Sequence, residues 1–198
     1  MEQFLTSLLG ALVGGVIALI GVYVAHRLQL SRERTQNEQI LRGFLQAILT
    51  ELETSWSRAE QTVNPVIEQL SPNAAFDRYV FIDTDFFTVY HNNSHLLGRV
   101  NDDSLRELIV ATYTQYKALT ETYNVNTRFL QRWKESEHTV SITADESLKR
   151  YYQQKAQREH AELVAWAHAL KHDHLELKQQ IDKLILALRN AIDVTAAT

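Results

Sequence analysis

The stretch Phe4–Ala25 reads FLTSLLGALVGGVIALIGVYVA, and it decides how the rest of the chain is interpreted. It holds 22 residues and no charge. At about 1.5 Å per residue, a helix of this length spans roughly 33 Å, enough to cross a bilayer core of about 30 Å. Lipid cannot satisfy backbone hydrogen-bonding groups, so such a segment crosses as a helix. We therefore expect an anchor region over residues 1–25 and one further domain over residues 26–198.

A cleaved signal peptide and a buried helix of a soluble protein are two other interpretations of this stretch. A signal peptide has a basic start and small residues before its cleavage site. Here Glu2 makes the start acidic, and the large Tyr23 lies where a small residue is needed for a cut after Ala25. Soluble core helices seldom run this long without a charge. The sequence therefore favours a retained transmembrane anchor.

The residues on either side of the stretch indicate its orientation. Glu2 is the charged side chain before it, and the residues after it are mainly basic: His26, Arg27, Arg32 and Arg34, interrupted by Glu33. Basic flanks stay on the cytoplasmic side of a membrane. We therefore predict a single-pass protein of the bacterial inner membrane with residues 26–198 in the cytoplasm. The alternative is an envelope tether of the spanin type, with the long helices in the periplasm.

Small residues recur every four positions within the stretch, at Gly10, Gly14 and Ala18. Such a spacing puts them on one helix face, where small side chains allow two helix backbones to approach closely in lipid. The pattern predicts self-association of the membrane helix, as a dimer or a larger ring. Membrane lipid and further copies of the chain are thus the expected partners, with another protein as an additional one.

Composition limits the fold and the chemistry of the remaining chain. Gly43 and Gly98 are its only glycines and Pro65 and Pro72 its only prolines, which suits long helices and argues against a hairpin-rich sheet. The absence of cysteine excludes disulfides and thiolate chemistry. A net charge of −4 gives no basic field for nucleic acid, so we expect no nucleic-acid binding.

Apolar spacing predicts the first soluble helix, from His26 to about Val63, as a continuation of the membrane helix. Pro65 ends it. Its apolar stripe consists of Leu41, Leu45, Ile48, Leu52, Trp56 and Ala59. The next region contains an aromatic-rich patch, interpreted as a short extended segment: Phe76, Tyr79, Val80, Phe81 and Ile82. A short helix capped by Thr84 or Asp85 should follow and end within residues 91–94.

Two long helices complete the predicted fold. The polar cluster Asn101–Ser104 should cap a helix that runs to about Glu135. Residues 139–143 should form a loop, and Thr143 with Glu146 should form a capping box. The last helix, over residues 145–194, carries a heptad seam that pairs either within the chain or between chains: Leu163, Ala167, Leu170, His174, Leu177, Ile181, Leu184, Leu188 and Ala191. The expected fold is all-α, with one transmembrane helix that continues into a cytoplasmic bundle of long antiparallel helices.

Three groups of side chains are candidates for a site. His168, His172 and Glu176 share one helix face, but no H-E-x-x-H motif accompanies them, so we expect a solvated polar face and no metal or other cofactor. His174 lies among the leucines of the seam, where it is either a pH-sensitive or register-setting core residue or a partly exposed one. The third group consists of large aromatic residues at helical spacing, interpreted as core packing: Tyr90, Tyr113, Tyr116, Tyr123, Trp56, Trp133 and Trp166.

Arg132 and His138 are separated by five residues, and this R-x₅-H spacing resembles that of HEPN-type ribonucleases. The resemblance implies a helical domain that pairs with a second copy, and RNA cleavage in which the 2′-hydroxyl attacks. The family favours a polar residue after the arginine, whereas this chain has Trp133.

The layout of the whole chain is similar to that of small bacterial and prophage membrane proteins linked with phage defence or superinfection exclusion. It also resembles the membrane accessory protein of type VI-B CRISPR systems. We therefore predict a non-enzymatic, self-associating membrane protein with a role in interaction, sensing or membrane perturbation, in phage defence. The seam residues Leu177, Ile181 and Leu184 are expected to contribute to self-association. A membrane-tethered HEPN-like ribonuclease that uses Arg132 and His138 is the alternative.

Overall fold

A computed structural model describes the backbone of residues 2–80 and 87–196 and the side chains of residues 19–80 and 87–194. Within these ranges the chain is helical and contains no strand, which confirms the predicted all-α class. The chain divides into two compact units, Met1–Gly43 and Phe44–Thr198. Each unit is described by itself below.

Helix α1 spans Glu2–Thr62, so the predicted continuation of the helix beyond Ala25 is confirmed. Its first part, up to Gly43, makes up the first unit. Among the residues that the structure describes, no helix has the length and apolar character that a membrane crossing requires. The predicted contact positions Gly10, Gly14 and Ala18 belong to residues whose side chains lie outside the described part of the chain.

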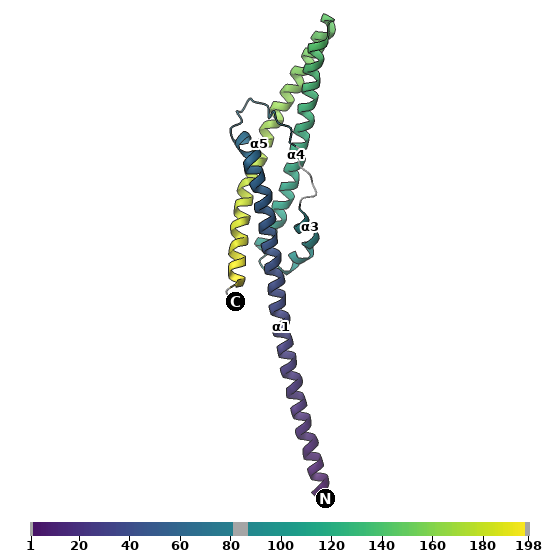
Figure 1. Ribbon diagram of the computed structural model, residues 1–198, viewed down its shortest axis with the longest axis vertical. Coiled ribbons are helices and arrows are strands. Elements are labelled where there is room, and N and C mark those ends of the chain that lie inside the picture. The colour runs from purple at the N-terminus through teal and green to yellow at the C-terminus, as the bar shows by residue number, and fades with distance from the viewer. Residues whose placement is uncertain (1, 81–86, 197–198) are drawn as a thin grey trace. The chain divides into compact units, whose positions relative to one another are not determined.

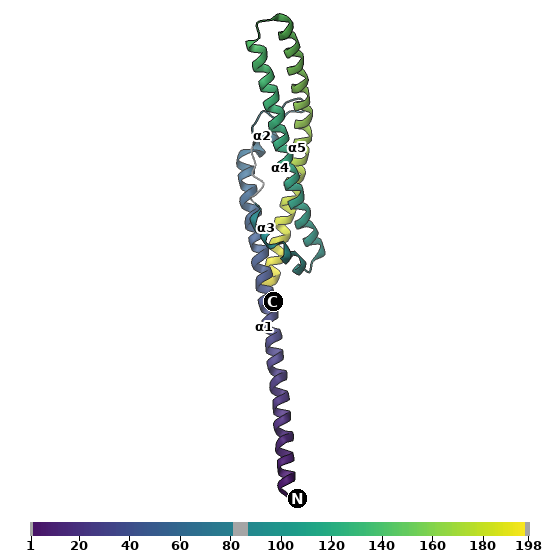
Figure 2. The ribbon, with the colours of Figure 1, turned by 90° about the vertical axis from the view of Figure 1, so that its right-hand side faces the viewer.

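The second unit is a helical bundle built mainly from α4 (Asp103–Ile142) and α5 (Glu146–Ala196). The two helices run antiparallel along each other, and the part of α1 that belongs to this unit lies beside them (Figures 1 and 2). Hydrogen bonds join α1 to both neighbours, from Tyr113 of α4 to Glu51 and from Arg189 of α5 to Glu53. The predicted bundle of long antiparallel helices is therefore confirmed for this unit.

The heptad seam of α5 forms the centre of the bundle. Eight seam side chains are at most 1% exposed: Leu163, Ala167, Leu170, His174, Leu177, Ile181, Leu184 and Leu188. The apolar stripe of α1 meets them, with Leu45, Ile48, Leu52 and Trp56 buried. Because these side chains are covered by the same chain, the seam pairs within the chain. A contribution of Leu177, Ile181 and Leu184 to self-association stays a prediction.

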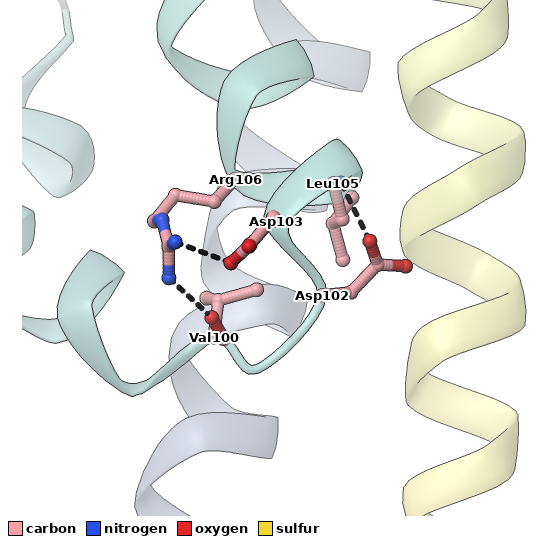
Figure 3. Close-up of polar contacts among 5 residues, drawn as sticks. All are labelled: Val100, Asp102, Asp103, Leu105 and Arg106. Carbon is pink, nitrogen blue, oxygen red and sulfur yellow. Dashed lines mark hydrogen bonds and ion pairs between the residues drawn. The ribbon is translucent and has the colours of Figure 1, made fainter.

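Helix α4 begins where the polar cluster predicted it. Asp102 is the N-cap, and its carboxylate accepts a hydrogen bond from the backbone N–H of Leu105 at 3.1 Å. The Arg106 guanidinium donates to the carbonyl oxygen of Val100 at 2.8 Å and pairs with Asp103, as Figure 3 shows. The side chains of the first turn thus fix both the start of α4 and the loop before it.

The far end of α4 differs from the prediction. The helix runs to Ile142 and includes most of the predicted loop over residues 139–143. The hydroxyls of Thr139 and Thr143 donate to carbonyl oxygens four residues earlier, at 2.8 and 2.7 Å, so these polar residues are accommodated inside the last turns. The predicted capping box at Thr143 is wrong as well. Asp145 instead accepts hydrogen bonds from the backbone N–H groups of Ser147 and Leu148 at the start of α5.

In the described residues between α1 and α4, 63–80 and 87–102, the elements are short: α2 (Asn64–Glu68), α3 (Thr88–Asn93) and the 3₁₀ helix η2 (Ser94–Arg99). Residues 73–80 are non-helical, as predicted, and Phe76 is 1% exposed. The predicted residues Phe81, Ile82, Thr84 and Asp85 lie outside the described part of the chain. The predicted end of the short helix within residues 91–94 is confirmed, because α3 ends at Asn93, and the separate 3₁₀ helix η2 follows it directly.

Candidate functional site

Arg132 and His138 both lie within α4, and each is exposed. The motif does not fall beside a loop, because α4 continues past it. His138 lies six positions after Arg132 in the helix, so the two Cα atoms are about 9 Å apart along the axis and the side chains point about 120° apart. Arg132 pairs with Glu162 at 3.5 Å and lies over the ring of Phe129 at 4.7 Å. The structure therefore does not bring the two candidate catalytic side chains together within one chain.

The three candidate metal ligands lie on the exposed face of α5. His168, His172 and Glu176 are exposed, and His172 Nε2 approaches the Glu176 carboxylate at 4.0 Å. Within the described part of the chain, no three histidine, aspartate or glutamate side chains are grouped so that they could hold a metal ion. This geometry is that of a solvated polar face.

His174 is placed differently, because its side chain is 1% exposed at the centre of the bundle. Its Nε2 lies 2.7 Å from Asn64 Oδ1, and its Nδ1 lies 2.9 Å from the hydroxyl of Tyr123. The ring of Trp56 stacks on the imidazole with centroids 5.4 Å apart. Three elements thus meet at one histidine: α1 through Trp56, α2 through Asn64 and α4 through Tyr123.

These contacts indicate which nitrogen of the His174 ring carries the proton. An amide oxygen only accepts hydrogen bonds, so Nε2–H donates to Asn64, and Nδ1 is left to accept from the Tyr123 hydroxyl. Burial lowers the pKa of His174 to about 4; the Glu68 carboxylate acts in the opposite direction, and the Lys178 ammonium lowers the pKa further. Burial also raises the pKa of Tyr123. Both groups are therefore neutral near pH 7, and the Tyr123 hydroxyl donates a hydrogen bond to Nδ1 of His174.

Two lysines lie on the same face of α5 as His174. Lys171 Nζ donates to the carbonyl oxygens of Glu68 and Leu70, both at 2.8 Å. Lys178 Nζ pairs with the Glu68 carboxylate at 2.5 Å, and this ion pair lowers the pKa of Glu68 and raises that of Lys178. Lys171, His174 and Lys178 therefore hold α2 and the residues just after it against α5.

A second polar cluster surrounds Glu51 of α1. Its carboxylate accepts hydrogen bonds from the backbone N–H groups of Val89 and Tyr90, at 2.7 and 3.2 Å, and from the hydroxyl of Tyr113 at 2.8 Å. Burial raises the pKa of Tyr113, and the Glu51 carboxylate raises it further. Glu51 thus caps the start of α3 from another helix, because the N-cap residue Phe87 has no side-chain oxygen to do so.

Ring contacts connect the two clusters through the core. Neighbouring centroids lie between 4.0 and 6.1 Å apart along Tyr90, Tyr113, Phe87, Tyr116, Trp56, His174, Tyr123 and Phe76. Core packing is therefore confirmed for Tyr113, Tyr116, Tyr123 and Trp56. Tyr90, Trp133 and Trp166 are only half-buried. A substrate cannot reach the His174 ring in this arrangement, which makes the cluster a polar element of the core.

Sequence reasoning placed His174 in the seam but missed its partners. Asn64 lies 110 residues away and Tyr123 lies 51 residues away, and neither carries a local pattern that points to the histidine. Comparisons with family models, with curated proteins and with solved structures found no match. The resemblance to phage-defence membrane proteins and to HEPN-type ribonucleases thus stays a prediction.

Proposed function

We propose that this protein is a membrane-anchored helical interaction protein. In this proposal Phe4–Ala25 crosses a lipid bilayer, and the bundle formed by the second unit contacts other proteins at the membrane surface. The observation that carries the proposal is the stretch of 22 uncharged residues at the start of a continuous helix. Self-association through the small residues of that stretch is part of the same proposal.

The described side chains at the end of the stretch support a lipid environment. Five apolar or aromatic side chains are between 49% and 72% exposed: Leu19, Ile20, Val22, Tyr23 and Val24. Because consecutive helical residues point about 100° apart, these five side chains spread over roughly 200° of the helix circumference, and the small residues Gly21 and Ala25 occupy the rest. A helix that is apolar all round needs an apolar environment on every side, which a bilayer supplies.

The geometry of the bundle supports a role in interaction over a role in catalysis. His174 and Tyr123, two groups whose pKa values are shifted by burial, lie in the core and are hydrogen-bonded to each other. Arg132 and His138 are exposed but point in different directions from α4. The long packed helices offer extended outer surfaces, and such surfaces suit the binding of another protein.

Extraction of membranes with alkaline carbonate tests the anchor. We expect the full chain to remain with the membrane pellet, because carbonate releases peripheral proteins but not transmembrane helices. The double substitution Val13→Arg and Ile17→Arg should move the chain out of the pellet, since each arginine near the centre of a spanning helix costs about 3 kcal/mol. Leu28→Arg, beyond the stretch, is the control and should stay in the pellet. Release of the wild-type chain by carbonate would overturn the proposal.

A further inference from the structure

Three side chains of α5 contact residues 63–70, the short segment that follows α1. Lys171, His174 and Lys178 are spaced by three and four residues, so they share one face of the helix. Each of them contacts residues 63–70: Lys171 through the carbonyl oxygens of Glu68 and Leu70, Lys178 through the Glu68 carboxylate, and His174 through Asn64. Within this segment Ile67 is 0% exposed, so the same contact also buries an apolar side chain. We call the contacts between residues 63–70 and this face of α5 the clasp.

We propose that the clasp is acid-sensitive: protonation of His174 releases residues 63–70 from α5 while the α4–α5 hairpin stays folded. The proposal stands on the arrangement of the clasp and does not depend on the proposed membrane anchor. Its release would uncover Ile67 and the polar face of α5, and both would then be accessible to a partner.

The charges around the ring explain why protonation opposes the closed clasp. A proton on His174 adds a third cation to the α5 face that already carries Lys171 and Lys178. From α2 the Glu68 carboxylate faces this group, but it is already paired with Lys178 at 2.5 Å. From α1 the ring meets Trp56, and Glu60 acts on Lys178. From α4 it meets the neutral hydroxyl of Tyr123. The new charge would thus be buried with incomplete compensation.

Within the clasp, residues 63–70 are the part that can detach while α4 and α5 stay packed together. Helix α2 has five residues, too few to be stable without tertiary contacts. The α4–α5 hairpin, by contrast, is held by the long buried seam. Detachment of residues 63–70 exposes less apolar surface than separation of α4 from α5. A buried charge on His174 should therefore cause residues 63–70 to detach first.

The pKa of His174 sets the pH window and the sign of the effect. In the closed clasp burial lowers it to about 4, whereas in the open clasp it returns toward the ordinary value of 6.5. The open form binds the proton more readily between these values, so acid favours opening and a pH above 6.5 favours the closed clasp. One proton changes the opening constant by up to about tenfold per pH unit, or about 300-fold across the window.

Hydrogen exchange of the full chain in detergent, measured by mass spectrometry and corrected for the intrinsic effect of pH, tests this proposal. As the pH falls from 6.5 to 4, the protection of residues 63–70 should decrease, and that of the seam residues 163–188 should remain. A wild-type protection of residues 63–70 that stays flat across the window overturns the proposal. An equal loss of protection in both segments also overturns it, because the bundle would then unfold as a whole.

Two glutamine variants assign the effect to one histidine. His174→Gln keeps a side chain that can donate and accept hydrogen bonds but removes the titration, so the pH dependence at residues 63–70 should disappear. His168→Gln changes an exposed histidine of the same helix and should behave like the wild type. Persistence of the acid response in His174→Gln overturns the proposal. If that variant does not fold, the slope of the wild-type opening constant against pH still decides the question.

Discussion

Ile181 lies in the middle of the α5 seam, with 0% of its side chain exposed. Ile181→Asp would place a carboxylate there without a partner, so we expect a loss of unfolding free energy on the order of 3 kcal/mol or more. Ile181→Leu keeps a similar volume and should cost less than about 1.5 kcal/mol. Urea unfolding of both full-length variants, followed by circular dichroism, measures the two losses. If the aspartate variant unfolds like the wild type, the seam is not the centre of the core.

Glu51 offers a second test, because one carboxylate serves two helices. In Glu51→Gln an N–H₂ group replaces one carboxylate oxygen. This donor would then face another donor, the N–H of Val89 or Tyr90 or the hydroxyl of Tyr113, so at least one hydrogen bond is lost. We expect a loss of about 2 kcal/mol and faster hydrogen exchange within α3.

Glu53→Gln is the matched control on the same helix. Its carboxylate pairs with Arg189 at 2.6 Å, but both side chains are substantially exposed, so the loss should be at most about 1 kcal/mol. Equal losses for the two variants would show that Glu51 contributes no more than a surface ion pair.

These side chains also show which details a sequence can predict. Asp102 caps the helix that begins next to it, so a local pattern was sufficient. At the start of α5 the local pattern indicated Thr143 as the capping residue, whereas Asp145, two residues closer to the helix, supplies the capping oxygen. Glu51 caps α3 by accepting a hydrogen bond from Val89, which lies 38 residues away in sequence, and no local pattern reveals such a partner.

The same distinction applies to whole helices. The α5 seam was predictable because its spacing repeats over several heptads, and its predicted members are buried except Ala191 near the end of the helix, which is half-buried. Helices α2 and α3 have five and six residues, and they are held by contacts from α5 and from Glu51. Their bounds depend on partners that the local sequence does not contain. For the same reason the spacing assigned His174 to the seam, but it left open whether the ring is buried and did not predict the hydrogen bonds to Asn64 and Tyr123.

Self-association of the membrane stretch is a prediction about the first part of α1. Gly10, Gly14 and Ala18 recur at a spacing that puts them on one helix face. A larger side chain on such a face separates the two helix backbones, and lipid supplies no hydrophobic drive to close the gap. We therefore expect Gly14→Ile to weaken the oligomer while leaving insertion intact, because isoleucine is favourable in a bilayer.

The measurement is crosslinking of the full chain in membranes, with Leu12→Ile as the control outside that face. The control should crosslink like the wild type, and Gly14→Ile should yield mainly monomer. If Gly14→Ile retains the wild-type oligomer, the small residues are incidental to assembly. The predicted contribution of Leu177, Ile181 and Leu184 of the seam would then have to account for any assembly.

We predict from the charges beside the stretch on which side of the membrane the bundle lies. Basic residues resist transfer across the inner membrane, and Arg27, Arg32 and Arg34 follow the stretch closely. Protease added to spheroplasts should therefore leave the second unit intact, and the same protease should digest it once the membrane is permeabilised. Changing the three arginines to glutamine and Gln3 to lysine reverses the charge bias, so part of the population should become sensitive in sealed spheroplasts. Digestion of the wild-type bundle in sealed spheroplasts would place it in the periplasm, where the chain would act as an envelope tether.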